Sequence, residues 1–129
     1  MKRPCGSCPY RKDVPSGVWS EEEYDKLPPY DNDTGEQPFA AFFCHQQDGS
    51  LCSGWVGCHD MAENIGIRFA YAAQLITAET FLEALDYECP VELWESGRAA
   101  RDHGMAELEE PGDKAKKIVH KLTKKLGLE

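Results

Sequence analysis

Two thiols near the start of the chain, separated by two small residues, restrict this sequence more than any other feature. In Cys5-Gly-Ser-Cys8, the small Gly6 and Ser7 allow the backbone to close into a tight knuckle that turns both sulfurs toward one ion. The same spacing is typical of redox-active pairs, but such pairs usually begin a helix that follows a strand. Because nothing resembling a strand precedes Cys5, the spacing favours metal binding.

The amino-terminal part of the chain needs such a staple. Residues 1–59 hold five of the six cysteines, six of the eight prolines and six of the eleven glycines, so long helices are not expected there. A chain of 129 residues can bury a core, but it has little stability to spare. An ion that joins cysteines from distant parts of the sequence would add the stability that this part of the chain lacks.

The cysteines are expected to be reduced. Met1-Lys2-Arg3 is a basic start, but Pro4 and Cys5 follow where a signal peptide needs an apolar stretch. No apolar run approaches the roughly 18–20 residues that a membrane-spanning helix needs. We therefore predict a cytoplasmic protein, in which six cysteines indicate metal ligation or reactive thiols. Three disulfides are the alternative for a secreted protein.

A second pair of ligands is expected shortly before residue 59. Cys44 and Cys52 flank the turn sequence Asp48-Gly49, which favours a hairpin that would bring the two thiols together. Four thiolates suit Zn²⁺ in a tetrahedron, and they equally suit an iron–sulfur cluster. The predicted metal ligands are Cys5, Cys8, Cys44 and Cys52.

Further residues near this pair are candidate ligands. His45 is the first substitute for a thiol, and otherwise we expect it beside the ligands. Cys58 and His59 could complete the site, form half of a second site, or serve a structural role. Cys89 stands before Pro90, far from the other cysteines in sequence, and is predicted to be an inert core thiol.

The expected fold is a small α+β fold in a single domain over residues 1–129. A metal-stapled, Cys-rich half (1–59) contains a short β-hairpin, and a helical half (60–129) contains about four helices. A short helix is expected after Ser20, which forms a capping box with Glu23. The remaining elements are strands over 39–44 and 51–56, and helices over 60–76, 77–87, 96–108 and 113–126.

Charge is distributed unevenly along the chain. The formal net charge is −9, but residues 112–129 carry six lysines against two acidic residues, a net charge of +4. The preceding residues therefore carry −13. An acidic body repels phosphates, which non-specific nucleic-acid binding must neutralise. We expect a protein partner rather than nucleic acid or a membrane, and the sequence does not indicate an oligomeric state.

Four segments together form a specific set of motifs: Pro4-Cys-Gly-Ser-Cys-Pro-Tyr-Arg11, Asp13-Val-Pro-Ser-Gly-Val-Trp19, Phe43-Cys-His-Gln46 and Leu51-Cys-Ser-Gly-Trp-Val-Gly-Cys-His59. Through them the sequence resembles a family of uncharacterised cysteine-rich proteins from actinobacteria and their phages, a domain of unknown function. The resemblance covers nearly the whole chain and implies no activity. The Cys58-His59 pair looks typical only of a closer branch of the family. The resemblance implies one site shared by Cys5, Cys8, Cys44, His45 and Cys52.

Three classes of function remain open. A full cysteine set without a further acid–base constellation favours a metal-binding domain, with zinc or iron–sulfur, that acts as a non-catalytic protein-interaction or regulatory module. One alternative is a redox or iron–sulfur sensor. Another is a metal-dependent hydrolase or nuclease, which needs three protein ligands, an open position for water and a base such as His45 or His59.

Overall fold

The chain folds into helices joined by loops. A computed structural model describes residues 2–44, 50–108 and 111–126. Within these residues the backbone forms six α-helices and three short 3₁₀ turns. In chain order they are α1 (Glu21–Tyr24), η1 (Pro28–Asp31), η2 (Thr34–Glu36), α2 (Ser53–Cys58), η3 (Met61–Glu63), α3 (Ile65–Ala72), α4 (Ala78–Leu85), α5 (Gly97–Met105) and α6 (Asp113–Leu126).

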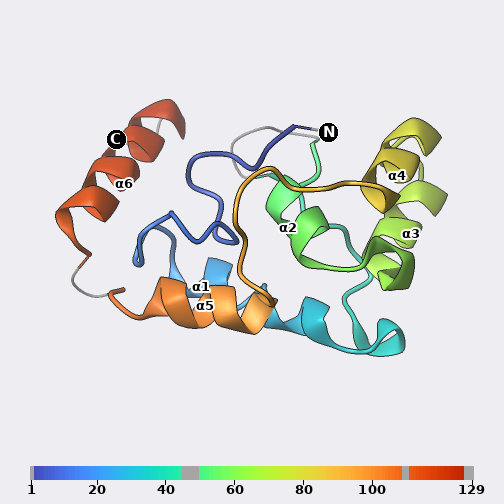
Figure 1. Cartoon of the computed structure of the whole chain (residues 1–129), viewed down its shortest axis with the longest axis horizontal. Helices are drawn as coiled ribbons and strands as arrows, with labels where there is room; N and C mark the ends of the chain where they lie inside the picture. Colours follow the sequence, from blue (N-terminus) through green and yellow to red (C-terminus); the bar gives the residue numbers. More distant parts are fainter. Residues whose placement is uncertain (1, 45–49, 109–110, 127–129) are drawn as a thin grey trace.

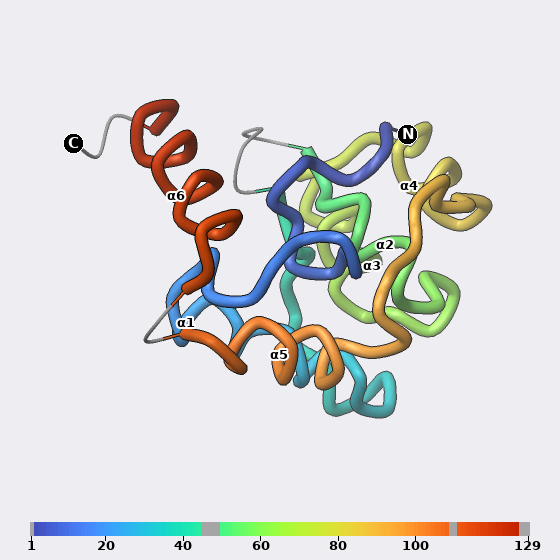
Figure 2. Tube along the Cα trace, turned by 60° about the vertical axis from the view of Figure 1, so that its left-hand side comes forward, coloured from blue at the N-terminus to red at the C-terminus, as the bar shows by residue number. Residues whose placement is uncertain are grey.

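The helices are spread along an elongated molecule. α6 lies at one end, and α3 and α4 pack against each other at the opposite end (Figure 1). α1 and α5 lie side by side along one edge, and α2 lies between the two ends (Figures 1 and 2). The amino-terminal segment runs across the middle of the molecule, between α6 and α2.

The predicted α+β fold is wrong. In the part of the chain that the structure describes there is no strand, sheet or hairpin, and β pairing is limited to two isolated bridges. One bridge joins Phe43 to Leu51, and the other joins Arg11 to Leu93. The segment 39–44 lacks the alternation of buried and exposed residues that a half-buried strand has, and its β pairing among the described residues is limited to the first bridge. The predicted turn at 46–49 lies outside the described residues.

The second predicted strand, 51–56, is mostly helix. The strand was predicted as the return of a hairpin after the Asp48-Gly49 turn, and Trp55 and Val56 within it are apolar and buried. They are buried because α2 is enclosed by the core. A short buried helix and a buried strand have similar apolar composition, so the sequence pattern does not distinguish them. The Val56 N–H donates to the Cys52 carbonyl at 3.0 Å, which is the helical pattern.

The last helices agree with the prediction more closely. α6 has the predicted bounds, and the hydroxyl of Thr77 caps α4 by accepting from Thr80 N. Ser96 caps α5 in the same way. α1 is shorter than expected, with four residues, and begins at the predicted Ser20 cap, whose hydroxyl accepts from Glu23 N at 3.4 Å. Local capping chemistry therefore located these helix starts correctly.

The helix predicted over 60–76 is divided in two. Asp60 caps η3, and Asn64 begins α3 by accepting from Ile67 N. The prediction ran one helix through Asn64. Asparagine favours caps over helix interiors, because its side chain forms hydrogen bonds with nearby backbone groups. Leu82 and Leu85 are large apolar residues of α4, yet they are 61% and 41% exposed.

α5 packs unusually closely on η1 and α1. A Cβ at Gly97 would overlap the Leu27 carbonyl, and one at Gly104 would overlap the ring of Tyr24. Asp31, at the end of η1, accepts from the backbone N–H groups of Gly97 and Arg98 at 2.7 and 2.9 Å. The first turn of α5 is therefore satisfied by a residue 66 positions earlier in the chain.

The core consists of two apolar clusters. The larger joins residues between Cys5 and Leu108, including Cys8, Tyr10, Cys52 and Trp55. The smaller lies under α6 and consists of Val14, Val18, Ala115 and Leu122. Trp19 is half-buried and packs against both clusters.

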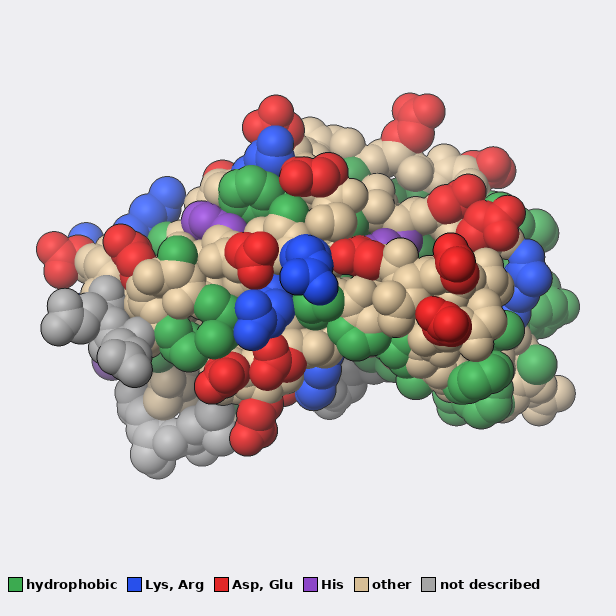
Figure 3. All heavy atoms as spheres, turned by 90° about the horizontal axis from the view of Figure 1, so that it is seen from below, with side chains coloured by type: hydrophobic (Ala, Val, Ile, Leu, Met, Phe, Trp, Pro, Cys, Tyr) green, Lys and Arg blue, Asp and Glu red, His purple; other side chains and the backbone are tan. Residues whose placement is uncertain are grey.

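The surface is acidic with one apolar end. Figure 3 shows acidic side chains spread over the face that is seen from below, and hydrophobic side chains gathered at the end that carries α3 and α4. None of the helices that the structure describes is both long and apolar enough to cross a membrane. The exposed large hydrophobic residues at this end include Phe69, Tyr71, Leu75, Leu82 and Leu85.

Candidate metal centre

Two of the predicted ligands are in direct contact in the core. The Sγ atoms of Cys8 and Cys52 lie 3.8 Å apart although the residues are 44 positions apart in sequence. Both side chains are almost completely shielded, with 1% and 4% exposure. Cys8 comes from the amino-terminal knuckle, and Cys52 is the residue that precedes α2.

Local backbone bonds form the knuckle. The Cys8 N–H donates to the Cys5 carbonyl at 3.1 Å, which closes the turn that Gly6 and Ser7 were expected to permit. The Arg11 N–H donates in turn to the Cys8 carbonyl at 3.1 Å. The Arg11 guanidinium donates to the Pro4 carbonyl at 3.0 Å, so this cation secures the backbone of the knuckle.

The Phe43–Leu51 bridge positions the other pair. On one side of it the Cys44 N–H donates to the Ser50 carbonyl at 2.7 Å, and on the other side the Cys52 N–H donates to the Phe42 carbonyl at 2.9 Å. The two cysteines thus lie beside each other as the sequence predicted, although through one bridge rather than through strands.

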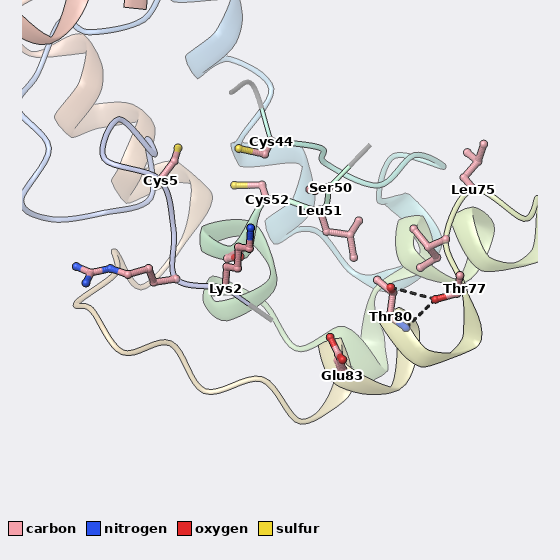
Figure 4. A pocket seen from close by; sticks show the side chains of 13 residues that line it. Lys2, Cys5, Cys44, Ser50, Leu51, Cys52, Leu75, Thr77, Thr80 and Glu83 are labelled. Atoms are coloured by element: carbon pink, nitrogen blue, oxygen red, sulfur yellow. Dashed lines mark hydrogen bonds between the residues drawn. The ribbon is translucent and has the colours of Figure 1, made fainter. Parts of the chain in front are cut away.

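Three of the four predicted ligands line one cavity, and the fourth contacts one of them. In Figure 4 the side chains of Cys44 and Cys52 point toward Cys5. Cys5 and Cys44 are half-buried and, with Cys52, line an open cavity of about 320 Å³. Cys8 lies behind this cavity, against Cys52. The region therefore has a sealed side, formed by Cys8 and Cys52, and an accessible side, formed by Cys5 and Cys44.

The environment of these thiols favours their protonated form. Burial, with a further contribution from repulsion by Cys8 and Cys44, raises the pKa of Cys5 to about 11. The hydrogen-bonding contact with Cys52, together with burial, raises the pKa of Cys8 well above that of a free thiol. A bound cation would reverse this preference, since a coordinating thiol is deprotonated.

Gly54 is a site residue that the sequence argument missed. A Cβ at this position would overlap the Cys8 sulfur and approach Tyr10 Cβ to 2.9 Å. α2 can therefore approach the knuckle only with glycine here, which allows Cys52 to reach Cys8. The segment Cys52-Ser-Gly offered a signal, because an isolated glycine beside a candidate ligand marks a close approach of backbone.

Cys58 and His59 lie apart from the cavity that Cys5, Cys44 and Cys52 line. They border a different cavity of about 290 Å³, together with Asp31 and Glu95. His59 Nδ1 lies 3.8 Å from Asp31 Oδ1, and His59 Nε2 lies 3.4 Å from the Tyr10 hydroxyl. Burial lowers the pKa of His59, despite the opposing effect of Asp31, and burial raises the pKa of Cys58 to about 12.

Cys89 is half-buried beside α2. It packs against Gly57 and neighbours Tyr87, whose pKa is raised to about 12 by burial and by Cys89. The Tyr87 hydroxyl donates to the Lys2 carbonyl at 2.9 Å, so this loop reaches the amino-terminal segment. His45 lies outside the described residues.

As they stand, the described side chains do not form a finished coordination sphere. Within residues 2–44, 50–108 and 111–126, no three His, Cys, Asp or Glu side chains converge closely enough to hold a metal ion. The six cysteines are free thiols. The structure thus contains one close thiol pair with two further thiols beside it.

Comparison with known proteins assigns the chain to a family. No curated protein and no solved structure matches it. A family model does match residues 1–124, a span that holds all six cysteines and every helix except the end of α6. The chain therefore belongs to the family of unknown function DUF6283.

Proposed function

We propose that this chain is a metal-binding protein in which Cys5, Cys8, Cys44 and Cys52 hold one Zn²⁺ ion. One observation carries the proposal: the knuckle and the segment before α2, far apart in sequence, bring Cys8 and Cys52 into contact with Cys5 and Cys44 beside them. A contact between two buried thiols with two further thiols beside them has little value for packing alone, and four thiolates are a complete ligand set for zinc.

The dimensions support this ligand set. Sulfurs that surround zinc at about 2.3 Å in a tetrahedron are separated by about 3.8 Å. The Cys8–Cys52 sulfurs have that separation. A contact between two thiols has a similar length, so the proposal depends on the presence of Cys5 and Cys44 beside this pair rather than on the distance.

Zinc binding requires a small adjustment on the accessible side. Cys5 and Cys44 must move toward Cys8 and Cys52 to close the coordination sphere, and their half-buried position beside the cavity leaves room for this. The sealed pair supplies a fixed half of the site. Metal binding would then contribute to folding free energy, as it does in small zinc domains.

Four thiolates leave no coordination position for water, which suits a structural ion in a non-catalytic module. We propose that the module binds a protein partner, since an acidic body with a short basic end is unsuited to nucleic acid. The biological role would then be interaction or regulation, with the ion holding the recognition surface in shape.

An iron–sulfur cluster is the second candidate. The observation that favours it is the accessible side of the site, because Cys5 and Cys44 border an open cavity through which oxidants can reach a cluster. The same four thiolates would ligate it. A cluster at this position would suit a sensor of oxygen or redox state.

Metal analysis of natively purified protein tests the proposal. We expect one zinc per chain and no visible absorption. Cys8→Ser and Cys52→Ser should lose the ion, whereas Cys89→Ser should keep it, because Cys89 lies outside the proposed set. A brown, iron-containing preparation made without oxygen would favour the cluster. Equal metal content in wild type and all three variants would overturn the ligand assignment.

A further inference from the structure

Trp19 connects the cysteine knuckle to the lysine-bearing helix α6. Its indole Nε1 donates to the Ser7 carbonyl at 2.7 Å, and Ser7 lies between Cys5 and Cys8. The same side chain packs against the apolar cluster under α6. A change in the shape of the knuckle therefore acts directly on the position of this indole.

α6 is docked almost entirely on the loop that contains Trp19. The cluster beneath it consists of Val14 and Val18 from the loop and Ala115 and Leu122 from the helix, with flanking contacts that include Trp19. Ala115 is fully buried and Leu122 is 8% exposed. No other segment of the described chain contributes to this cluster, so the loop alone decides whether the apolar face of α6 is covered.

The rest of the molecule holds the loop from the opposite side. The Gly17 N–H donates to the Gly104 carbonyl at 2.9 Å, and the N–H groups of Val18 and Trp19 donate to the Tyr24 hydroxyl at 3.1 Å. These bonds fix the backbone relative to α1 and α5. The indole is then the part of the loop that responds to the knuckle.

We propose that Trp19 couples the cysteine site to α6, so that the ion's presence in the site controls whether α6 is docked. The inference rests on the proposed function. When the ion holds Cys5 and Cys8, the Ser7 carbonyl is fixed and the indole supports α6. When the ion is lost, the knuckle relaxes, the indole loses its acceptor, and α6 detaches more often from the loop.

Release of α6 would change what the protein presents to a partner. The helix carries an apolar stripe next to exposed lysines, among them Lys114, Lys117, Lys121 and Lys124. Docked, it covers Ala115 and Leu122 and presents mainly lysines, whereas a released α6 is a basic amphipathic segment able to bind an acidic, apolar groove. The state of the metal site would thereby be read by a protein partner.

Hydrogen exchange of the full chain tests the coupling. The zinc-loaded wild type is compared with Trp19→Phe, which keeps a ring in the cluster but removes the indole donor. Trp94→Phe is the matched control, because the Nε1 of Trp94 is buried without a hydrogen-bond partner among the described residues. Leu122→Ala defines the exchange rate of an undocked α6. Metal content is measured in every sample.

We expect Trp19→Phe to keep its zinc and to lose protection in α6 by about tenfold, within the range of ordinary coupling between sites. Protection in α3 and α4 should not change, and Trp94→Phe should match wild type. Removing zinc from wild type should expose α6 at least as much as Trp19→Phe does. Unchanged α6 protection in zinc-loaded Trp19→Phe would overturn the coupling. A wild type that holds no zinc would instead overturn the proposed function and the control by the ion, while the variants would still report whether the indole bond holds α6.

Discussion

At the scale of single residues, the proposed site depends on a missing side chain as much as on the thiols. Gly54 allows α2 to lie against the Cys8 sulfur and Tyr10. Within a helix, replacing glycine by alanine normally gains about 0.8–1 kcal/mol. Here the added carbon would have to displace a buried sulfur and a ring, so the packing cost acts against that gain.

We predict that Gly54→Ala destabilises the chain by about 1–3 kcal/mol, the usual cost of overpacking a core, and weakens metal binding. Gly35→Ala is the control, since a Cβ there would meet nothing within 4 Å. Denaturant unfolding and zinc titration measure both effects. A Gly54→Ala chain as stable as wild type would show that α2 can move away from Cys8 at no cost.

His59 provides a second prediction at this scale, on acid sensitivity. Burial lowers the pKa of His59 in the folded chain below its unfolded value of 6.5. Below pH 6.5 the unfolded chain therefore binds a proton that the folded chain resists, and stability falls as the pH decreases through the folded pKa. We expect stability to fall more steeply below about pH 6.5 in wild type than in His59→Asn.

The measurement is the free energy of unfolding against pH for both chains, at equal zinc content. Identical slopes in wild type and His59→Asn would mean that this imidazole protonates without cost in the folded state. In that case the contacts with Tyr10 and Asp31 would not keep the imidazole in its neutral form.

At the scale of secondary structure, the start of α5 depends on a residue from a distant turn. Both carboxylate oxygens of Asp31 accept backbone N–H groups at the beginning of α5. We predict that Asp31→Ala costs about 0.5–2 kcal/mol, the usual range for a lost cap. Asp33→Ala should cost little, because the Asp33 side chain makes no capping bond. Hydrogen exchange at Gly97 and Arg98 should report the loss directly, and unchanged exchange there would contradict the capping role.

The sequence predicted elements well where the chemistry is local. Caps such as Ser20, Thr77 and Ser96 act within one helical turn, and the amphipathic stripe of α6 lies within fourteen residues, so both can be recognised in a short window. The hairpin failed because an apolar run does not specify its backbone conformation. The contact of Gly54 with Cys8 joins residues 46 positions apart, and no local pattern contains it.

The candidate site was predicted in part for the same reason. The Cys5–Cys8 spacing predicts a tight knuckle, and a backbone hydrogen bond between these two residues closes it. Cys44 and Cys52 were predicted as a second pair because a four-coordinate site needs one, and of these the structure places Cys52 against Cys8. Cys58 and His59 follow closely in sequence, yet α2 carries them to another cavity, because a helix changes the direction of successive side chains.

At the scale of the whole molecule, the proposed ion should reduce the loss of folding stability at alkaline pH. Without metal, the pKa of Cys5 is about 11 in the folded chain and 9.0 when unperturbed, so unfolding releases a proton between these values. A folded pKa above the unfolded one means that stability is present at lower pH and is lost as the pH rises through this window. Cys8 adds to the same trend.

With zinc bound, the ligand thiols have already lost their protons, so this source of alkaline instability disappears. Zinc uptake by the metal-free chain should in turn release one proton for each ligating thiol, and the affinity should increase with pH. We therefore predict that the metal-free chain loses stability between about pH 9 and 11 more steeply than the zinc-loaded chain does. Burial also raises the pKa of Tyr10, but this effect is present in both forms and largely cancels in the comparison. Thermal unfolding of the two forms across this range, under reducing conditions, measures the difference. Parallel pH profiles would mean that the ion does not bind these thiols, and the proposed ligand set would then have to be abandoned.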